Sequence, residues 1–222
     1  MSSFDVEARA RHSRGASEIA IYEMVQRALK ERASFGGVLV DVGCGTGNLR
    51  SYVGSSFARY IGVDAVKYEA FPGDAEFIRL DLDSGRAPLP DGIANVVVAV
   101  ETIEHLENPR AFVRELTRLA APGGWVVITT PNQCSLLSLA NVVLRGQFVA
   151  FKDENYPAHL TALLPSDLRR IAQECCLCEE VISYSHAGRV LLTRRHYPAA
   201  VSRAFPQAFS DNVLIIGRKP HV

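Results

Sequence analysis

The chain has 222 residues, a length that suggests one domain built around a single core. Hydrophobic residues make up 48%, charged residues 22% and aromatic residues 8%, a globular mixture that excludes disordered, collagen-like and coiled-coil proteins. The 24 basic and 24 acidic side chains cancel, so the composition carries no electrostatic footprint for a long polyanion and disfavours nucleic acid as a partner.

The sequence also carries signals of location. Its five cysteines form no regular framework, and its first residues lack the apolar run of a secretion signal, which together indicate a reducing cytoplasm. No stretch reaches the roughly 18 apolar residues that cross a membrane. The nearest, residues 136–144, is interrupted by Ser138 and Asn141. We therefore expect a cytoplasmic protein without a membrane span, and the oligomeric state stays open.

The first half of the chain alternates helices with short apolar strands. Residues 1–16 are predicted to form a mobile arm, and residues 17–33 an amphipathic helix, because apolar side chains recur there at helical spacing. Asn108 and Pro109 open a further helix that runs to Leu119. The predicted strands are residues 38–42, 60–64, 76–81, 94–100 and 125–130. This alternation predicts an α/β fold with a doubly wound, mostly parallel sheet.

The rhythm breaks after the fifth strand. Residues 131–165 are predicted to be a substrate-side insertion or lid within a single domain that covers residues 1–222. Ser166 is predicted to cap the next helix. Two more strands follow, at residues 178–184 and 212–218. Between them, residues 185–210 are predicted to be irregular. They carry only basic charges, which favours a solvated surface, with an anionic acceptor as the alternative.

A glycine-rich turn follows the first strand. Gly43, Gly45 and Gly47 permit tight backbone angles and let a ligand approach without meeting a side chain. A dinucleotide turn needs its third glycine one position later, where this chain has Asn48. The phosphate-gripping Gly-Lys-Ser/Thr sequence is also missing. The spacing therefore favours a nucleoside-type ligand over a dinucleotide or a nucleoside triphosphate.

Acidic residues stand at successive strand ends. Asp64 lies 21 positions after Gly43, where this architecture places a carboxylate on ribose hydroxyls. Asp41 and Asp81 belong to the neighbouring strand ends. A carboxylate at the rim of a buried sheet is costly unless it has a partner. A single aspartate is commonly a helix cap, but the three together indicate a nucleoside-bearing ligand without phosphates.

These motifs resemble those of the class I S-adenosylmethionine-dependent methyltransferases. The similarity covers roughly residues 38–132 and becomes weaker beyond. The matching stretches are residues 40–47, 62–64, 80–82, 101–106, and 122–124 before a strand that ends at residues 130–132. The resemblance implies a Rossmann-like sheet of seven strands whose last strand, at residues 212–218, inserts antiparallel.

The resemblance also implies how S-adenosylmethionine binds. The backbone of Gly43, Cys44 and Gly45, with Asp41 behind it, would hold the methionine end, and Asp64 would hold the ribose hydroxyls. Further residues would complete the site: Asp81 and the Leu82 backbone at the adenine, and Glu101 beside the sulfonium.

The acceptor side of the site is predicted after the fourth strand. Glu101, Glu104 and His105 form the pattern E-x-x-E-H, and His159 lies in the later insertion. A histidine near neutral pH can take the proton of a hydroxyl acceptor, so His105 and His159 are the candidate bases, with Glu104 beside them. We favour His105, because it is anchored at a strand end. Tyr156 and residues 136–151 would roof the acceptor pocket.

Three functions remain open at this stage. The favoured one is an enzyme that methylates a hydroxyl of a small molecule, sugar or lipid-linked glycan. The E-x-x-E-H pattern with a distant histidine also resembles metal-dependent RNA 2′-O-methyltransferases, in which all four residues would bind the ion. It equally resembles quinone and surface-glycan methyltransferases without a metal there, so we predict no metal. The third possibility is a non-catalytic partner protein that keeps the cofactor site.

Overall fold

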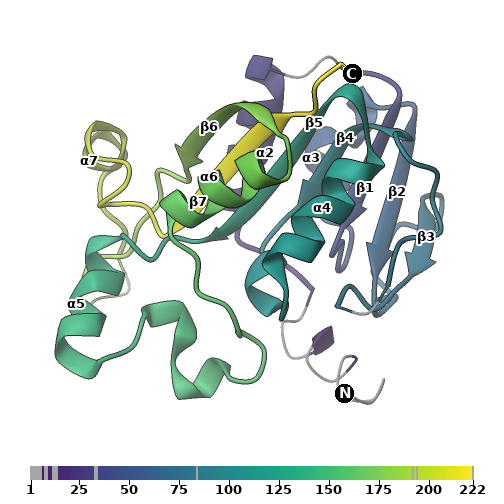
Figure 1. Ribbon diagram of the computed structural model, residues 1–222. Coiled ribbons are helices and arrows are strands. Elements are labelled where there is room, and N and C mark those ends of the chain that lie inside the picture. Colours follow the sequence, from purple (N-terminus) through teal and green to yellow (C-terminus); the bar gives the residue numbers. More distant parts are fainter. Residues whose placement is uncertain are drawn as a thin grey trace.

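The computed structural model describes residues 7, 10–11, 15–32, 35–83, 85–191, 193 and 195–221. Its centre is a seven-stranded sheet in the order β3-β2-β1-β4-β5-β7-β6. The strands are β1 (Val38–Val42), β2 (Arg59–Asp64), β3 (Glu76–Arg79), β4 (Ala94–Ala99), β5 (Ala120–Pro131), β6 (Cys178–Tyr184) and β7 (Asn212–Arg218). β1 to β5 pair in parallel, and β7 runs antiparallel between β5 and β6. The expected Rossmann-like sheet is confirmed (Figure 1).

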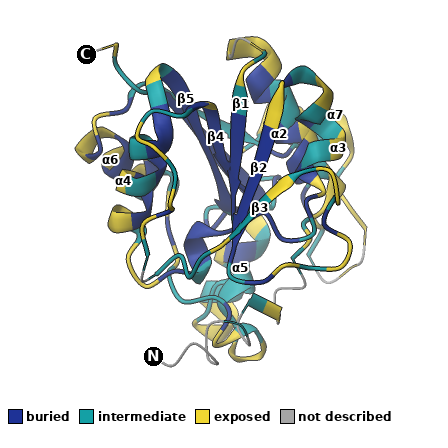
Figure 2. Cartoon of the chain, turned by 90° about the vertical axis from the view of Figure 1, so that its right-hand side faces the viewer, coloured by how far each residue is buried: buried dark blue, intermediate teal, exposed yellow. Residues whose placement is uncertain are grey.

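Helices cover both faces of the sheet. The described helices are α2 (Ile19–Arg32), α3 (Leu49–Val53), α4 (Pro109–Leu119), α5 (Leu136–Arg145), α6 (Pro165–Glu174) and α7 (Ala199–Ala204). Side chains of a strand alternate between the faces. Val40 and Val42 of β1 therefore pack in the cluster that contains α4 and α6, whereas Leu39 packs in the cluster that contains α2 and α3. Figure 2 shows the resulting buried strands between more exposed helices.

Two local predictions are wrong. The helix α6 begins at Pro165, so Ser166 lies inside it and does not cap it. Proline suits the first helical position because its backbone is already set to the helical angle, and the Asp167 carboxylate accepts the Leu164 N–H at 3.1 Å. The segment at residues 185–210 is not wholly irregular either, because it contains the short helix α7.

Of the two segments predicted to be mobile, the structure describes only a small part of the first and all of the second. Most of the arm predicted at residues 1–16 lies outside the described residues. Residues 131–165 contain α5 and two 3-10 turns, at Val149–Phe151 and Asp153–Asn155. Their action as a lid stays a prediction. No helix among the described residues is long and apolar enough to cross a membrane.

The strand order explains where a ligand can bind. The chain proceeds from β1 outward to β3 and then returns to β4 on the other side of β1. In such sheets the connections leave β1 and β4 in opposite directions, so a crevice opens at their carboxyl ends. The glycine turn after β1 and the E-x-x-E-H pattern after β4 therefore meet at one place.

Candidate active site

A cavity of about 370 Å³ lies at this crevice. Gly47 is outside its lining, but the other residues predicted for the site line it: Asp41, Gly43, Cys44, Gly45, Asp64, Asp81, Leu82, Glu101, Glu104, His105 and His159. β3 ends at Arg79, so Asp81 reaches the cavity from the loop beyond the strand. The cavity thus joins the predicted donor residues to the predicted acceptor residues.

The glycines of the turn are needed for protein packing as well as for a ligand. All three have positive φ, at 77° for Gly43, 51° for Gly45 and 75° for Gly47. A Cβ at Gly43 would lie 2.2 Å from Thr102 Oγ1, and one at Gly45 would lie 2.1 Å from the carbonyl oxygen of Gly15. The space that a side chain would take is therefore already occupied by neighbouring chain.

Asp41 is fully buried beneath the turn, with 1% of its surface exposed. The Tyr60 hydroxyl donates a hydrogen bond to its Oδ2, while its Oδ1 has no partner among the described residues. Burial raises the pKa of Asp41 to about 7. An unpartnered carboxylate oxygen is costly inside a protein, and a cationic ligand would remove that cost.

Asp64 at the end of β2 anchors the glycine turn. The Gly45 N–H donates to its Oδ2 at 2.8 Å, and the Val66 N–H donates to its Oδ1 at 3.1 Å. Burial raises the pKa of Asp64, and these two bonds partly oppose that rise. Each carboxylate oxygen can accept a second hydrogen bond. The carboxylate therefore has room for the two ribose hydroxyls expected of it.

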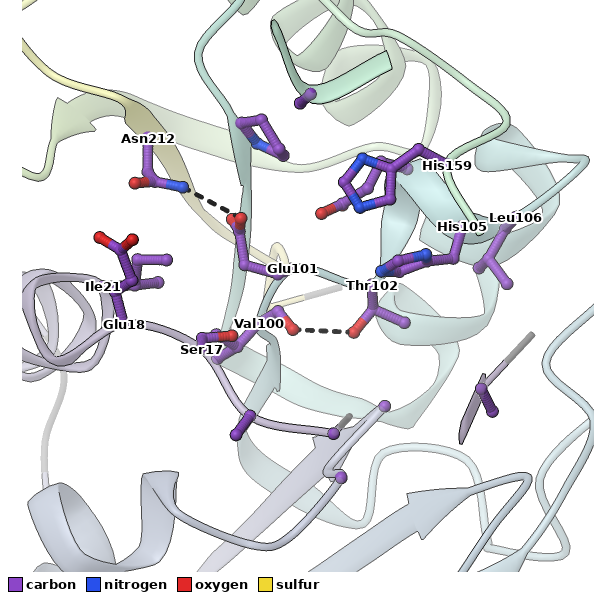
Figure 3. Close-up of a pocket in the computed structure, with 18 of the residues that line it drawn as sticks. Ser17, Glu18, Ile21, Val100, Glu101, Thr102, His105, Leu106, His159 and Asn212 are labelled. Atoms are coloured by element: carbon purple, nitrogen blue, oxygen red, sulfur yellow. Dashed lines mark hydrogen bonds between the residues drawn. The ribbon is translucent and has the colours of Figure 1, made fainter. Parts of the chain in front are cut away.

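Glu101 follows β4 in a strained conformation. Its φ of 48° is uncommon for a residue with a side chain, and such strain typically costs about 1 to 3 kcal/mol. Thr129 Oγ1 donates to one carboxylate oxygen at 3.1 Å, and the Asn212 amide donates to the other at 3.0 Å, as Figure 3 shows for Asn212. Burial, with repulsion from Glu104, holds the pKa of Glu101 well above its usual value.

Glu104 and His105 stand on the 3-10 turn Ile103–His105. Glu104 is fully buried, and burial raises its pKa to about 8. Thr130 Oγ1 donates to its Oε2 at 3.1 Å, whereas its Oε1 finds no partner in the described part of the chain. Its carbonyl oxygen accepts the N–H groups of Leu160 and Thr161, at 2.8 and 3.0 Å. Glu104 thus fastens the insertion to the end of β4.

The rings of His105 and His159 face each other on one wall of the cavity, as Figure 3 shows. Their centroids are 4.7 Å apart, with an angle of 80° between the planes. His105 Nδ1 lies 2.7 Å from the carbonyl oxygen of Ala158. A carbonyl only accepts, so Nδ1 carries the proton and Nε2 of the neutral ring has a lone pair. His159 directly precedes Leu160 and Thr161, whose N–H groups bond to the Glu104 carbonyl, so its segment is also tied to the end of β4. The preference for His105 stays a prediction.

Three of these residues could also hold a metal ion. Ligand atoms of Glu104, His105 and His159 lie within 4.8 Å of one another. Glu101 is outside this group, because its carboxylate is bonded to Thr129 and Asn212. The four-residue metal site considered from the sequence is therefore not assembled in the described structure, although a three-residue site is.

Several lining residues could not be found by sequence reasoning. Ser17, Glu18 and Ile21, at the start of α2, lie across the cavity from the histidines (Figure 3). Arg189 also lines the cavity, where it is paired with Asp211. These contacts depend on how distant segments pack, and no local motif marks them. Tyr156, by contrast, was expected over the pocket but is 70% exposed and outside its lining.

Comparisons with known proteins agree with this geometry. A family model described as a methyltransferase domain matches residues 13–175. The chain belongs to this methyltransferase family. A probable S-adenosylmethionine-dependent methyltransferase of Mycolicibacterium smegmatis is 27% identical over 195 residues, which cover 86% of this chain and 71% of that protein.

A further relative and a solved structure are also similar to this methyltransferase. The ubiquinone biosynthesis O-methyltransferase of Chromobacterium violaceum is 26% identical over 159 residues, covering 67% of each chain. The crystal structure of a methyltransferase dependent on S-adenosylmethionine, from Archaeoglobus fulgidus, superimposes with a TM-score of 0.62. It is 21% identical and covers 89% of this chain and 94% of that one, which shows a shared fold.

The chemistry of the lining fits S-adenosylmethionine, the methyl donor of this enzyme family. Asp41, Asp64, Glu101 and Glu104 all face the cavity, and the pKa of each is raised by burial. A ligand with a positive sulfonium would stabilise their ionised forms, whereas the phosphates of a dinucleotide would be repelled. The carboxyl groups therefore favour a cationic donor, in agreement with the glycine spacing.

Replacing Asp64 tests its expected contact with the ribose. Asp64→Ala should weaken S-adenosylmethionine binding by about 100-fold. Two hydrogen bonds to a charged group contribute roughly 1.5 to 3 kcal/mol each, and water would replace only part of the lost interaction. Asp64→Asn should lose less, since the amide keeps one acceptor. Calorimetric titration measures both. The control is Asp74→Asn, whose carboxylate is 73% exposed and pairs with Arg50. Unchanged affinity in Asp64→Ala would remove the assignment.

Proposed function

We propose that this methyltransferase methylates a hydroxyl group of a small-molecule, sugar or lipid-linked glycan acceptor. The observation that carries the proposal is the paired histidines in the cavity that also holds the glycine turn. S-adenosylmethionine, when bound, supplies a methyl group on a positively charged sulfur. Transfer to a hydroxyl then requires that the acceptor be aligned with the methyl group and lose its proton.

His105 is suited to the proton step. Its Nδ1 is held by the Ala158 carbonyl, so the ring is fixed and Nε2 is the basic atom. His159 packs edge-on against it and also against Phe151, with ring centroids 5.4 Å apart in the second contact. We assign the base to this pair, with Glu104 as a positioning residue that ties the insertion to the strand end.

The lining of the cavity supports an acceptor with both apolar and polar parts. Leu137, Val149 and Ala150 bring apolar surface from the insertion, whereas Ser138 and Arg189 bring polar groups. The similarity to a ubiquinone biosynthesis O-methyltransferase supports a hydroxyl as the acceptor group. The balanced charge of the chain still disfavours RNA.

Product formation with a panel of acceptors tests the proposal directly. Catechols, hydroquinones, free sugars and lipid-linked glycans are incubated with labelled S-adenosylmethionine, and labelled methyl ether is measured. Label in an ether supports the proposal. Label on nitrogen or carbon alone would overturn O-methylation. Tight donor binding without product from any member would instead favour a non-catalytic partner protein.

The pH dependence of donor binding follows from the buried carboxyl groups. Between pH 6 and 8 Asp41, with a pKa of about 7, loses its proton, so attraction for the sulfonium should grow. The demethylated product is neutral at sulfur but otherwise carries the same charges. The ratio of its dissociation constant to that of S-adenosylmethionine should therefore rise about tenfold or less over this range. Calorimetry at several pH values measures the ratio, and Asp41→Asn should flatten it. A flat ratio in the unchanged protein would contradict the electrostatic argument.

Loss of the histidines should affect turnover more than binding. General-base catalysis contributes about 100- to 10,000-fold, so His105→Ala and His159→Ala should each lower kcat by amounts in that range, with donor affinity nearly unchanged. His221→Ala is the matched control, because that imidazole is exposed and lies outside the cavity lining. Full activity in both cavity variants would remove the histidine base and leave alignment as the main source of catalysis.

A chelator separates the base from a metal. With a histidine base, activity should persist after dialysis against EDTA, and added Mg²⁺, Mn²⁺ or Zn²⁺ should change it less than twofold. Glu104, His105 and His159 are close enough to share a metal ion, so dependence of the activity on a metal would point to these three residues. Loss of activity on chelation and its recovery with one metal would replace the base with metal-assisted catalysis.

A further inference from the structure

The helix α5 presents an apolar face to solvent. All ten of its residues are described, and the one that is buried is Ser138. A surface helix normally turns its apolar side to the core and its polar side to water. In α5 the exposed side chains other than Arg145 are apolar: Leu136 at 40%, Leu139 at 47%, Val143 at 84% and Leu144 at 76%. The orientation is the reverse of that expected for a helix with water on its outer side.

The outer face of α5 is close to the cavity. Leu137 and Ser138, on its inner side, line the cavity. In Figure 1 the helix projects beyond the end of the sheet at which the site is built. The segment before β7 lies against its first turn, because the Leu136 N–H donates to the Ala208 carbonyl at 2.8 Å. Anything that covers the outer face of α5 would therefore sit beside this part of the cavity wall.

The two segments that meet there have only basic charges. Residues 134–152 and 185–210 contain no Asp or Glu, although the chain as a whole is neutral. Arg189 is paired with Asp211, but Arg145, Arg195 and Arg203 are exposed. Apolar side chains flanked by cations suit an anionic bilayer, whose surface attracts basic groups while its interior accepts apolar ones. A second copy of the chain would bring the same positive charge and be repelled.

We propose that α5 and the described residues between 185 and 210 form a docking surface for an anionic lipid bilayer. Val143 and Leu144 enter the interface between headgroups and acyl chains, and the arginines contact the headgroups. The cavity then opens next to the membrane, so a lipid-borne acceptor reaches the histidines without crossing water. Docking itself does not depend on methyl transfer, and only the delivery of the acceptor rests on the function proposed above.

Vesicle sedimentation of the full chain tests the docking. Vesicles of phosphatidylcholine are compared with vesicles that also contain phosphatidylglycerol, at low and at high salt. We expect binding to the anionic vesicles, weakened by salt. The double variant Val143→Ser with Leu144→Ser should lower the partition coefficient by about tenfold or more, because it removes two apolar side chains from the interface. Arg145→Gln with Arg203→Gln should lower it by about tenfold and reduce the effect of salt.

Matched controls identify the surface. Ile19→Ser changes an apolar side chain that is 65% exposed but lies on α2, and it should bind vesicles as the unchanged protein does. All variants should keep their melting temperature and their affinity for S-adenosylmethionine. Equal sedimentation with neutral and anionic vesicles, or full binding by the α5 variant, would overturn the proposal. A dimer that forms without lipid and is abolished in the α5 variant would also overturn the proposal, because α5 would then be a contact between two copies of the chain. Methyl transfer without vesicle binding overturns docking alone, whereas binding without methyl transfer leaves docking in place.

Discussion

The burial of carboxyl groups at one edge of the sheet is the constraint on which the rest of the site depends. Parallel strands place Asp41 and Asp64 at neighbouring carboxyl ends, and the strand that returns beside β1 adds Glu101 and Glu104. Protein donors satisfy Asp64 and Glu101, but one oxygen each of Asp41 and Glu104 has no partner among the residues that the structure describes. Such groups are expensive to bury. The fold tolerates them because the sheet around them supplies a large apolar core.

This electrostatic arrangement connects the two halves of the reaction. The carboxylates would stabilise a cationic methyl donor, and the charge on its sulfur would be lost on methyl transfer. The product therefore loses part of the attraction that held the donor, which favours its release. The same loss of charge makes the protonation states of Asp41 and Glu104 depend on which ligand is bound. Binding and turnover are thus coupled to pH through groups that need not touch the acceptor.

The insertion after β5 has two faces with different tasks. Its inner side is fastened to the strand end by the hydrogen bonds from Leu160 and Thr161 to the Glu104 carbonyl, which carries His159 to His105. Its outer side, on α5, exposes leucines and valines. One segment thus lines the cavity and also presents the surface that we assign to lipid. This arrangement explains why a stretch rich in leucine contributes little to the core.

The sequence by itself predicted the strands and most of the helices in chain order, the glycine turn, and a set of donor-side residues that, except for Gly47, line one cavity. These follow from local rules, because apolar periodicity and glycine spacing act over a few residues. Only the tertiary structure decided that His105 and His159 touch, that Glu101 turns away from them toward Asn212, and that α5 faces solvent with its apolar side. These features depend on contacts between segments far apart in the chain. A pattern of residues does not show which side of a helix its neighbours will cover, since that is settled when the whole chain packs.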